Sequence, residues 1–430
     1  MVYRCFSLHR VLFFARLVLL LFSGSSLAVA SPEVVRSEHG MQMQVDLNNV
    51  DVEPSAFLYE EHAVVVPKQD RALVLSLHPG LQQHLSALLE RNEVPAAGVV
   101  VMEAKTGRVL AYVSHQSDAK QSNVERAQSV DWAREAKAPA ASVFKIVTAA
   151  ALLDSGITAS KKTCYSGGRS SLVASNLLDN PAHDTSCASF AQALGYSINS
   201  VFAKLAVQNL KPQTLERYAS AFGFGHALPF DLPTSISAVD IPQDDLEFAR
   251  MAAGFRHSTL SPLHGALLAS TIANQGVMPR PYMIQSVRYP CGEIEVAHDS
   301  SPFRSVIPSS TARVLGSMME RTVSSGTSYK SFHDKDGKAY LPGVSVAAKT
   351  GSLSDSNPFR AYSWWVGYAP AQNPKFAVGV LVVNHPSWRI KAPYVAKEAL
   401  RYGLYEMKSQ KATPSQERAC RQGSHDSFSG

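Results

Sequence analysis

The first clear pattern of apolar and polar positions along the chain is that of a helix. Leucines recur at positions 81, 85, 88 and 89, directly after Pro79, and this spacing places them on one helix face. Proline is favoured in the first turn of a helix, so we expect a helix to begin near residue 79. Residues 31–75 lack such a pattern, apart from one short apolar run, and we expect them to form a short, partly β-like N-terminal extension.

Two groups of predicted strands stand on either side of a long helical stretch. Runs bounded by turn residues and rich in apolar side chains are typical of buried strands. They cover residues 97–103, 108–114, 346–351, 361–368 and 376–384. The pattern between the two groups is mostly helical from residue 142 to about 276, and a closing helix is expected from Pro393. We therefore predict an α+β fold: an antiparallel five-stranded sheet flanked by terminal helices, with a large, mostly helical lobe inserted and a cleft between the lobes.

Composition supports a large folded core. The chain has 430 residues, of which 45% are hydrophobic and 18% charged, and this balance argues against disorder. Its net charge of +6 suits an anionic polymer as a partner, although ordinary solubility is the simpler explanation, and we expect no nucleic-acid partner. Residues 409–430 are polar and contain Pro, Ser and Gly, so a flexible tail is expected there.

The N-terminus carries an export signal. Three arginines precede the apolar run 17–22, and Ala28-Val29-Ala30 offers a cleavage site before Ser31. Residues 1–30 are therefore interpreted as a signal peptide or, if they stay uncut, as an N-terminal membrane anchor. Either alternative exports the chain to the periplasm or to the outer face of the cytoplasmic membrane.

Four cysteines follow the export signal, and an oxidising compartment permits them to pair. Cys164 and Cys187 are the favoured bridge because they flank one polar loop. The alternative is that they are buried as small hydrophobic residues. Cys291 and Cys420 are left open as free or paired.

A serine and a lysine stand three residues apart at the start of the helical region. In Ser142-Val143-Phe144-Lys145 the two polar side chains share a helix face, about 4.5 Å apart along the axis. Serine becomes a nucleophile when a neighbouring base takes its proton, and burial removes the charge of a lysine so that it can be this base. Taken alone, the pair also fits a capping serine beside an exposed lysine.

Two further polar motifs follow. Ser197-Ile198-Asn199 precedes another apolar helical run; it supplies a second hydroxyl and an amide, or simply caps that helix and bonds local backbone. Lys349-Thr350-Gly351 ends a predicted strand. Strict alternation sends Lys349 and Thr350 to opposite faces, so both serve one site only if this strand borders the cleft by its edge. The alternative for Lys349 is a cation at the end of a hairpin.

Other motif-like stretches are assigned no chemistry. Lys105-Thr106-Gly107 repeats the last tripeptide but falls between two predicted strands, where a turn is expected. Asp334-Lys335-Asp336-Gly337 lacks the later glutamate of a calcium loop, so a turn is expected there too. The fourteen histidines form no H-E-x-x-H motif or tight cluster with cysteine, and we expect no metal or other cofactor.

The ordered set S-x-x-K, S-x-N and K-T-G resembles the penicillin-binding transpeptidases of bacterial cell-wall synthesis. Ser197 follows Ser142 by 55 residues, and Lys349 follows Ser197 by 152, which are gaps that this family shows. Stretches 97–114, 260–279 and 361–370 are similar to the family as well. We take the resemblance to cover residues 76–408, as a stand-alone transpeptidase domain.

The resemblance implies a role for each motif residue. Ser142 is the nucleophile and Lys145 its base, while Ser197 passes a proton to the departing amine and Asn199 holds Lys145 and the substrate amide. In the third motif Lys349 adds positive potential. Three neighbours of Lys349 complete the implied set: Thr350 for the terminal carboxylate of the substrate, Gly351 for close approach of its backbone, and Ser352 for an oxyanion hole shared with the backbone of Ser142.

The resemblance also implies a reaction and its partners. A serine D,D-transpeptidase cross-links peptidoglycan stem peptides at their D-Ala-D-Ala ends, is a target of β-lactams and works with a glycosyltransferase, here on a separate chain. The alternatives are a D,D-carboxypeptidase, a β-lactamase of the same superfamily, or a non-catalytic penicillin-binding scaffold or sensor. A β-lactamase is disfavoured because no E-x-x-x-N segment stands between the second and third motifs and because Asn199 departs from the S-x-V branch.

Overall fold

The computed structural model describes residues 52–117, 130–290, 292–299, 301–386 and 388–407. All of them belong to one compact unit, Glu33–Gly430, while a separate unit comprises Met1–Pro32. The expected export signal, the polar tail and the two remaining cysteines, Cys291 and Cys420, lie outside the described residues. No helix in the described part of the chain is long and apolar enough to cross a membrane.

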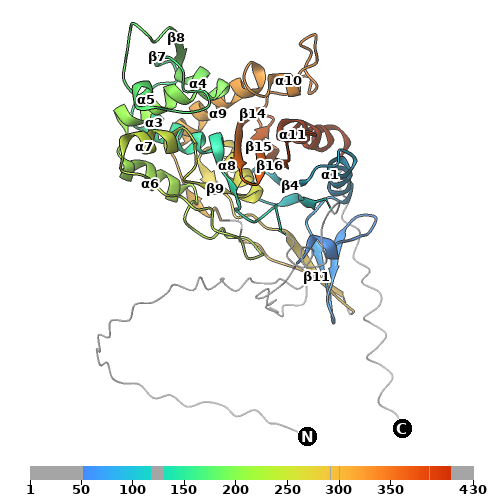
Figure 1. Ribbon diagram of the computed structural model, residues 1–430. Coiled ribbons are helices and arrows are strands. Elements are labelled where there is room, and N and C mark those ends of the chain that lie inside the picture. The colour runs from blue at the N-terminus through green and yellow to red at the C-terminus, as the bar shows by residue number, and fades with distance from the viewer. Residues whose placement is uncertain (1–51, 118–129, 291, 300, 387, 408–430) are drawn as a thin grey trace, which may run out of the picture. The chain divides into compact units, whose positions relative to one another are not determined.

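The centre of the described unit is the predicted antiparallel five-stranded sheet, in the order β14-β15-β16-β4-β5 (Figure 1). Its strands are β4 (Ala96–Glu103), β5 (Val109–Gln116), β14 (Ala347–Ser356), β15 (Phe359–Ala369) and β16 (Phe376–Asn384). Strands from the two ends of the sequence meet where β16 pairs with β4, for example Val380 with Val99. The sequence prediction of this sheet, assembled from both ends of the chain, is confirmed.

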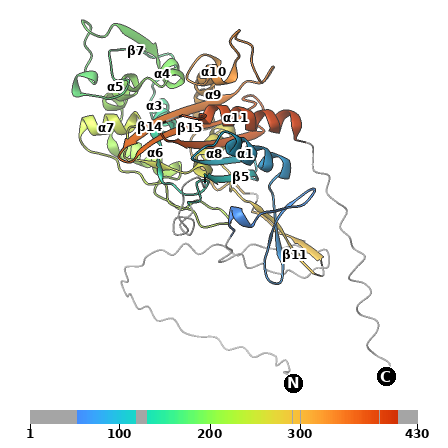
Figure 2. The same cartoon turned by 45° about the vertical axis from the view of Figure 1, so that its right-hand side comes forward.

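Both faces of the sheet are covered, which explains the continuous apolar runs. Every residue of β16 is buried. The terminal helices α1 (Pro79–Arg91) and α11 (Ala392–Arg401) pack on one face, and α8 (Pro262–Ala273) packs on the other (Figure 2). Strand alternation places the neighbouring Trp364 and Trp365 in these two different cores.

The helical lobe lies between β5 and β14 in the chain and carries most of the expected helices. They are η2 (Ala141–Phe144), α3 (Lys145–Asp154), η3 (Ala174–Asn176), α4 (Phe190–Tyr196), α5 (Asn199–Asn209), α6 (Pro212–Ala221), α7 (Asp245–Ala252), α8, α9 (Ser309–Ser324) and α10 (Tyr329–Phe332). Short strand pairs interrupt them: β6 (Ala138–Pro139) with β9 (Thr259–Leu260), β7 (Lys162–Tyr165) with β8 (Ser186–Ser189), and β10 (Val277–Met278) with β13 (Arg304–Ser305).

A second five-stranded sheet was not predicted. It has the order β1-β2-β3-β11-β12 and joins the expected N-terminal extension to a segment about 200 residues later. Its strands are β1 (Leu58–Tyr59), β2 (Val64–Pro67), β3 (Ala72–Leu75), β11 (Ile284–Tyr289) and β12 (Gly292–Glu295); the short helix η1 (Pro54–Ala56) precedes them, and the helical turn η4 (Tyr402–Glu406) closes the described chain. The extension is therefore an integral part of the fold, at least from β1 onward.

Candidate active site

Ser142 lies in the 3-10 turn η2, directly before α3. The backbone of the preceding Ala141 is in the left-handed region, with φ of 49°. Two glycines close around this turn: a Cβ added to Gly254 would lie 2.4 Å from the carbonyl oxygen of Ala141, and one added to Gly351 would lie 3.3 Å from that of Ala140. The turn that carries the serine is thus fixed by close packing from two distant segments.

Lys145 is fully buried and contacts Ser142 as its spacing in the sequence predicts. Its Nζ lies 2.9 Å from Ser142 Oγ and 2.7 Å from Asn199 Oδ1, and it also donates to the backbone oxygen of Ala253. Burial holds the pKa of Lys145 well below its ordinary value, and the charge of Lys349 lowers it further.

The partners of Lys145 define where its lone pair points. The oxygens of Asn199 and Ala253 only accept hydrogen bonds. A neutral amine has two N–H groups, and these two acceptors engage both of them. The lone pair is then left for the third neighbour, Ser142, whose hydroxyl can donate to it. This arrangement suits a base that removes the serine proton.

Ser197 and Lys349 form a second pair beside the first. Lys349 Nζ donates to Ser197 Oγ at 2.9 Å and to the backbone oxygen of Thr350 at 2.8 Å. Lys349 is fully buried, and this burial lowers its pKa to about 7. The alternative in which Ser197 caps the next helix is wrong, because Ser197 ends α4 with φ of 58° and Ile198 occupies the N-cap position of α5 without a side-chain bond.

The third motif lies on β14, which is the edge strand of the main sheet. This is the position that allows Lys349 and Thr350 to serve one site. The Thr350 hydroxyl lies 2.6 Å from that of Thr327, and Ser352 and Ser354 are exposed further along the same edge. Such an edge leaves backbone groups unpaired and open to an extended peptide.

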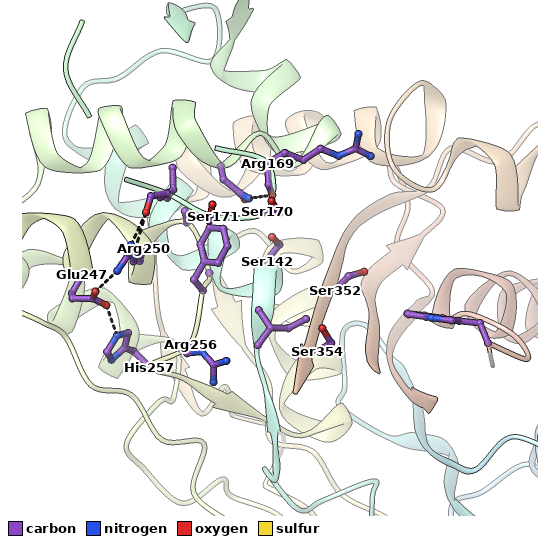
Figure 3. A pocket seen from close by; sticks show the side chains of 17 residues that line it. Ser142, Arg169, Ser170, Ser171, Glu247, Arg250, Arg256, His257, Ser352 and Ser354 are labelled. Carbon is purple, nitrogen blue, oxygen red and sulfur yellow. Dashed lines mark hydrogen bonds and ion pairs between the residues drawn. The ribbon is translucent and has the colours of Figure 1, made fainter. Parts of the chain in front are cut away.

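A pocket of about 680 Å³ opens at Ser142. It lies between the helical lobe and β14, as Figure 3 shows. Its lining includes Ser142, Arg169, Ser170, Ser171, Leu172, Asn199, Glu247, Arg250, Ala253, Gly254, Phe255, Arg256, His257, Ser352, Leu353, Ser354 and Trp388. Ser142 of the first motif, the amide of the second and the strand after the third therefore meet at one cavity.

Residues 97–401 match the family model of the penicillin-binding protein transpeptidase domain. The chain belongs to this family. Among curated relatives, peptidoglycan D,D-transpeptidase PbpA of Mycobacterium tuberculosis is 28% identical over 339 residues, which are 72% of this chain and 66% of that protein. MrdA of Haemophilus influenzae, also a peptidoglycan D,D-transpeptidase, is 22% identical, over 78% of this chain and 56% of that protein. The chain spans between about half and two thirds of the length of these relatives.

Solved penicillin-binding transpeptidases have the same fold. PBPA from Mycobacterium tuberculosis is 26% identical with a TM-score of 0.63, over 76% of this chain and 81% of that chain. The D,D-transpeptidase domain of a peptidoglycan glycosyltransferase from Eggerthella lenta has a TM-score of 0.65 at 23% identity, over 86% of this chain and 94% of that chain. The predicted fold class and family are therefore confirmed.

The transpeptidase domain holds Asn199 through a loop that the disulfide secures. Cys164 and Cys187, the pair favoured by the sequence, are joined and link β7 to β8. Between them, the backbone oxygens of Gly168 and Arg169 accept hydrogen bonds from Asn199 Nδ2 at 3.2 and 2.9 Å. The amide therefore cannot rotate without losing these bonds, and its oxygen stays directed at Lys145.

Several groups that complete the site were not predicted from the sequence. The backbone oxygen of Ala253 binds Lys145, and the Thr327 hydroxyl binds that of Thr350. A backbone carbonyl has no signal in the sequence, because every residue supplies one. Gly254 was a weak signal in the sequence, since glycine is typical just after the C-cap of a helix; it follows the C-cap residue of α7, Ala253, and adopts φ of 81°.

Proposed function

We propose that the chain is a serine D,D-transpeptidase that cross-links peptidoglycan stem peptides through an acyl-enzyme on Ser142. The observation that carries this proposal is the contact of 2.9 Å between Lys145 Nζ and Ser142 Oγ, with both N–H groups of the neutral amine engaged elsewhere. The names of the relatives as D,D-transpeptidases support the same reaction.

Acylation begins when Lys145 takes the proton of Ser142. The serine oxygen attacks the carbonyl of the penultimate D-alanine and forms a tetrahedral intermediate. The backbone N–H groups of Ser142 and Ser352 bind its oxyanion; both residues line the pocket. Asn199 keeps Lys145 in line and bonds the amide of the substrate.

The leaving amine then needs a proton. Ser197 is the group that passes it, because Lys349 donates to its hydroxyl at 2.9 Å and can replace the proton that it gives up. The terminal carboxylate of the donor peptide binds to the Thr350 hydroxyl beside Thr327, in the positive potential of Lys349. Gly351 lets β14 lie close to the turn that carries the nucleophile.

Deacylation completes the reaction. An amine from a neighbouring stem peptide attacks the ester of Ser142 and forms the amide cross-link. Its proton passes through Ser197 to Lys349, and Lys145 returns a proton to Ser142 Oγ as the ester C–O bond breaks. Attack by water in place of the amine makes the enzyme a D,D-carboxypeptidase. A β-lactam mimics the donor and leaves a stable ester. Structures of PBPA from Mycobacterium tuberculosis as acyl-enzymes with imipenem and penicillin G support this for a protein of the same family.

The proposed reaction takes place outside the cytoplasm, where peptidoglycan lies. The disulfide between Cys164 and Cys187 supports an oxidising location, in the periplasm or at the outer face of the cytoplasmic membrane. A separate glycosyltransferase would supply the glycan strands. The proposed reaction needs no cofactor, because side chains supply the base and the acid and backbone N–H groups supply the oxyanion donors.

Labelling with a fluorescent penicillin tests the nucleophile. Wild type should be labelled covalently and Ser142→Ala should not; equal labelling of both would refute the assignment. Purified nascent peptidoglycan then distinguishes the reactions, because cross-linked dimers report transpeptidation and trimmed monomers report carboxypeptidation. Steady turnover of nitrocefin would instead favour a β-lactamase.

A further inference from the structure

The wall of the pocket that faces β14 is built from strained backbone. Arg256 and His257 are consecutive and both adopt positive φ, 39° and 62°. Residues other than glycine rarely adopt this conformation, and where they do the surrounding structure has to hold them there. Both residues line the pocket that opens at Ser142. The surrounding structure therefore holds Arg256 and His257 in a costly backbone conformation at the wall of the pocket.

Neighbouring elements hold the segment on both sides. The backbone N–H of Phe255 donates to Arg250 at 2.9 Å, and the backbone oxygen of His257 accepts from Asp240 at 2.8 Å. The His257 ring contacts Glu247 at 3.2 Å. These contacts fix the backbone before and after Arg256, so its side chain is projected from a rigid support.

Arg256 differs from its neighbour Arg250 in what its guanidinium binds. Arg250 is engaged by the backbone oxygen of Leu172, at 3.1 and 2.7 Å, and by Glu247. Arg256 is exposed and makes no side-chain hydrogen bond or ion pair within the part of the chain that the structure describes. Its five donors are therefore available to a ligand.

The charge around Arg256 favours an anion. The pocket at Ser142 is lined by three arginines and a single glutamate. Arg256 also borders a second hollow of about 250 Å³, where Arg360 and Asp355 are the other charged residues. Positive charge exceeds negative charge in both, and Arg256 is the residue that they share.

The position of Arg256 corresponds to the upstream part of an extended donor peptide. The terminal carboxylate of the donor is assigned to Thr350, so the residues before the reacting carbonyl continue past Ser352 towards Ser354. Two residues of extended chain span about 6.6 Å. Figure 3 shows Arg256 at the Ser354 end of the pocket, across from β14.

We propose, on the basis of the proposed function, that Arg256 is a specificity-determining residue that binds a free carboxylate on the donor peptide, upstream of the acylated D-alanine. Arginine binds carboxylates through two parallel hydrogen bonds, and the edge of β14 binds the peptide backbone alongside. A donor whose upstream carboxylate is blocked as an amide loses this contact.

Two synthetic donors test the proposal. Both end in D-Ala-D-Ala and differ only in whether the carboxylate two residues upstream of the acylated D-alanine is free or amidated. Wild type should show a kcat/KM at least roughly 10-fold higher for the free acid, since a hydrogen bond to a charged group contributes on this scale. Equal kcat/KM for the two donors would overturn the proposal without any variant.

Substitution assigns the effect to Arg256. Arg256→Ala should reduce the ratio of kcat/KM for the free-acid donor to kcat/KM for the amidated donor to about 1, mainly by raising KM for the free acid. Arg256→Lys should restore part of this ratio. Arg217→Ala, on the exposed face of α6 away from the pocket, should keep the wild-type preference. A preference retained by Arg256→Ala would contradict the proposal. Failure of wild type to be labelled at Ser142 by penicillin, or to use either donor, would refute the proposed function as well.

Discussion

Replacing Lys349 by methionine removes a charge from the site while keeping an unbranched side chain in a fully buried space. The proposed reaction uses this charge to attract the carboxylate of the donor or of a β-lactam. A hydrogen bond to a charged group contributes about 1.5–3 kcal/mol, so the second-order rate constant for acylation should fall roughly 10- to 150-fold while Lys349 is protonated.

The size of this defect should depend on pH. Burial lowers the pKa of Lys349 to about 7, so the wild-type amine is charged below pH 7 and neutral above it. The ratio of wild-type to variant rate constants should thus be largest near pH 6 and shrink towards pH 9. Loss of the charge at residue 349 also raises the pKa of Lys145. At low pH a smaller fraction of Lys145 is then neutral and able to act as the base, which increases the ratio of wild-type to variant rate constants further.

The assay is the rate of covalent labelling by a penicillin whose carboxylate stays ionised, measured from pH 5.5 to 9.5. The pH dependence of the second-order rate constant of labelling reports the pKa values of the free enzyme. Lys105→Met is the matched control, because Lys105 begins the same tripeptide but is exposed in the turn after β4. A defect of Lys349→Met that is equally large at pH 6 and pH 9 would refute the role given to its charge.

Three further predictions concern stability. Gly254→Ala should lower the free energy of unfolding at least about 2 kcal/mol more than Gly156→Ala. Both positions need positive φ, but only at Gly254 does the added Cβ lie 2.4 Å from a backbone oxygen, that of Ala141 beside Ser142. Thermal denaturation measures this difference, and equal losses would contradict it. Replacing both Cys164 and Cys187 by serine should cost about 3 kcal/mol for a loop of 23 residues and slow penicillin labelling, whereas an unchanged melting temperature would contradict this. Between pH 7 and about 10, Lys349 binds fewer protons in the folded protein than in the unfolded protein, because burial lowers its pKa to about 7. The free energy of unfolding of wild type should therefore rise with pH over this range. The melting temperature of Lys349→Met should rise less than that of wild type.

The main sheet was predictable because its strands are buried on both faces. Continuous apolar runs such as the one in β16 are visible without knowledge of their partners. The second sheet was missed because β3 is short and pairs with β11, more than 200 residues later. Pairing over such a distance depends on tertiary contacts, among them the Asp231 carboxylate that accepts from the backbone N–H groups of Met283 and Ile284 at 2.5 and 2.7 Å.

The part of the site that is formed by polar side chains at a fixed, short spacing in the sequence was predictable. The contact between Ser142 and Lys145 follows from helical spacing alone. The contact between Ser197 and Lys349 joins residues 152 positions apart, and no local pattern states it. The contact of Ala253 with Lys145 and the position of Arg256 at the pocket depend on backbone geometry after α7, which the sequence does not display.

The left-handed backbone at Ser197 narrows the substitutions that evolution can accept at this position. Glycine and asparagine tolerate φ of 58° but lack the hydroxyl that contacts Lys349. Threonine keeps a hydroxyl, yet its branched Cβ makes the same backbone costly. A lineage selected for slower acylation by β-lactams therefore has little room to change residue 197 itself, and adaptive change should accumulate in the surrounding segments that adjust how the hydroxyl is held.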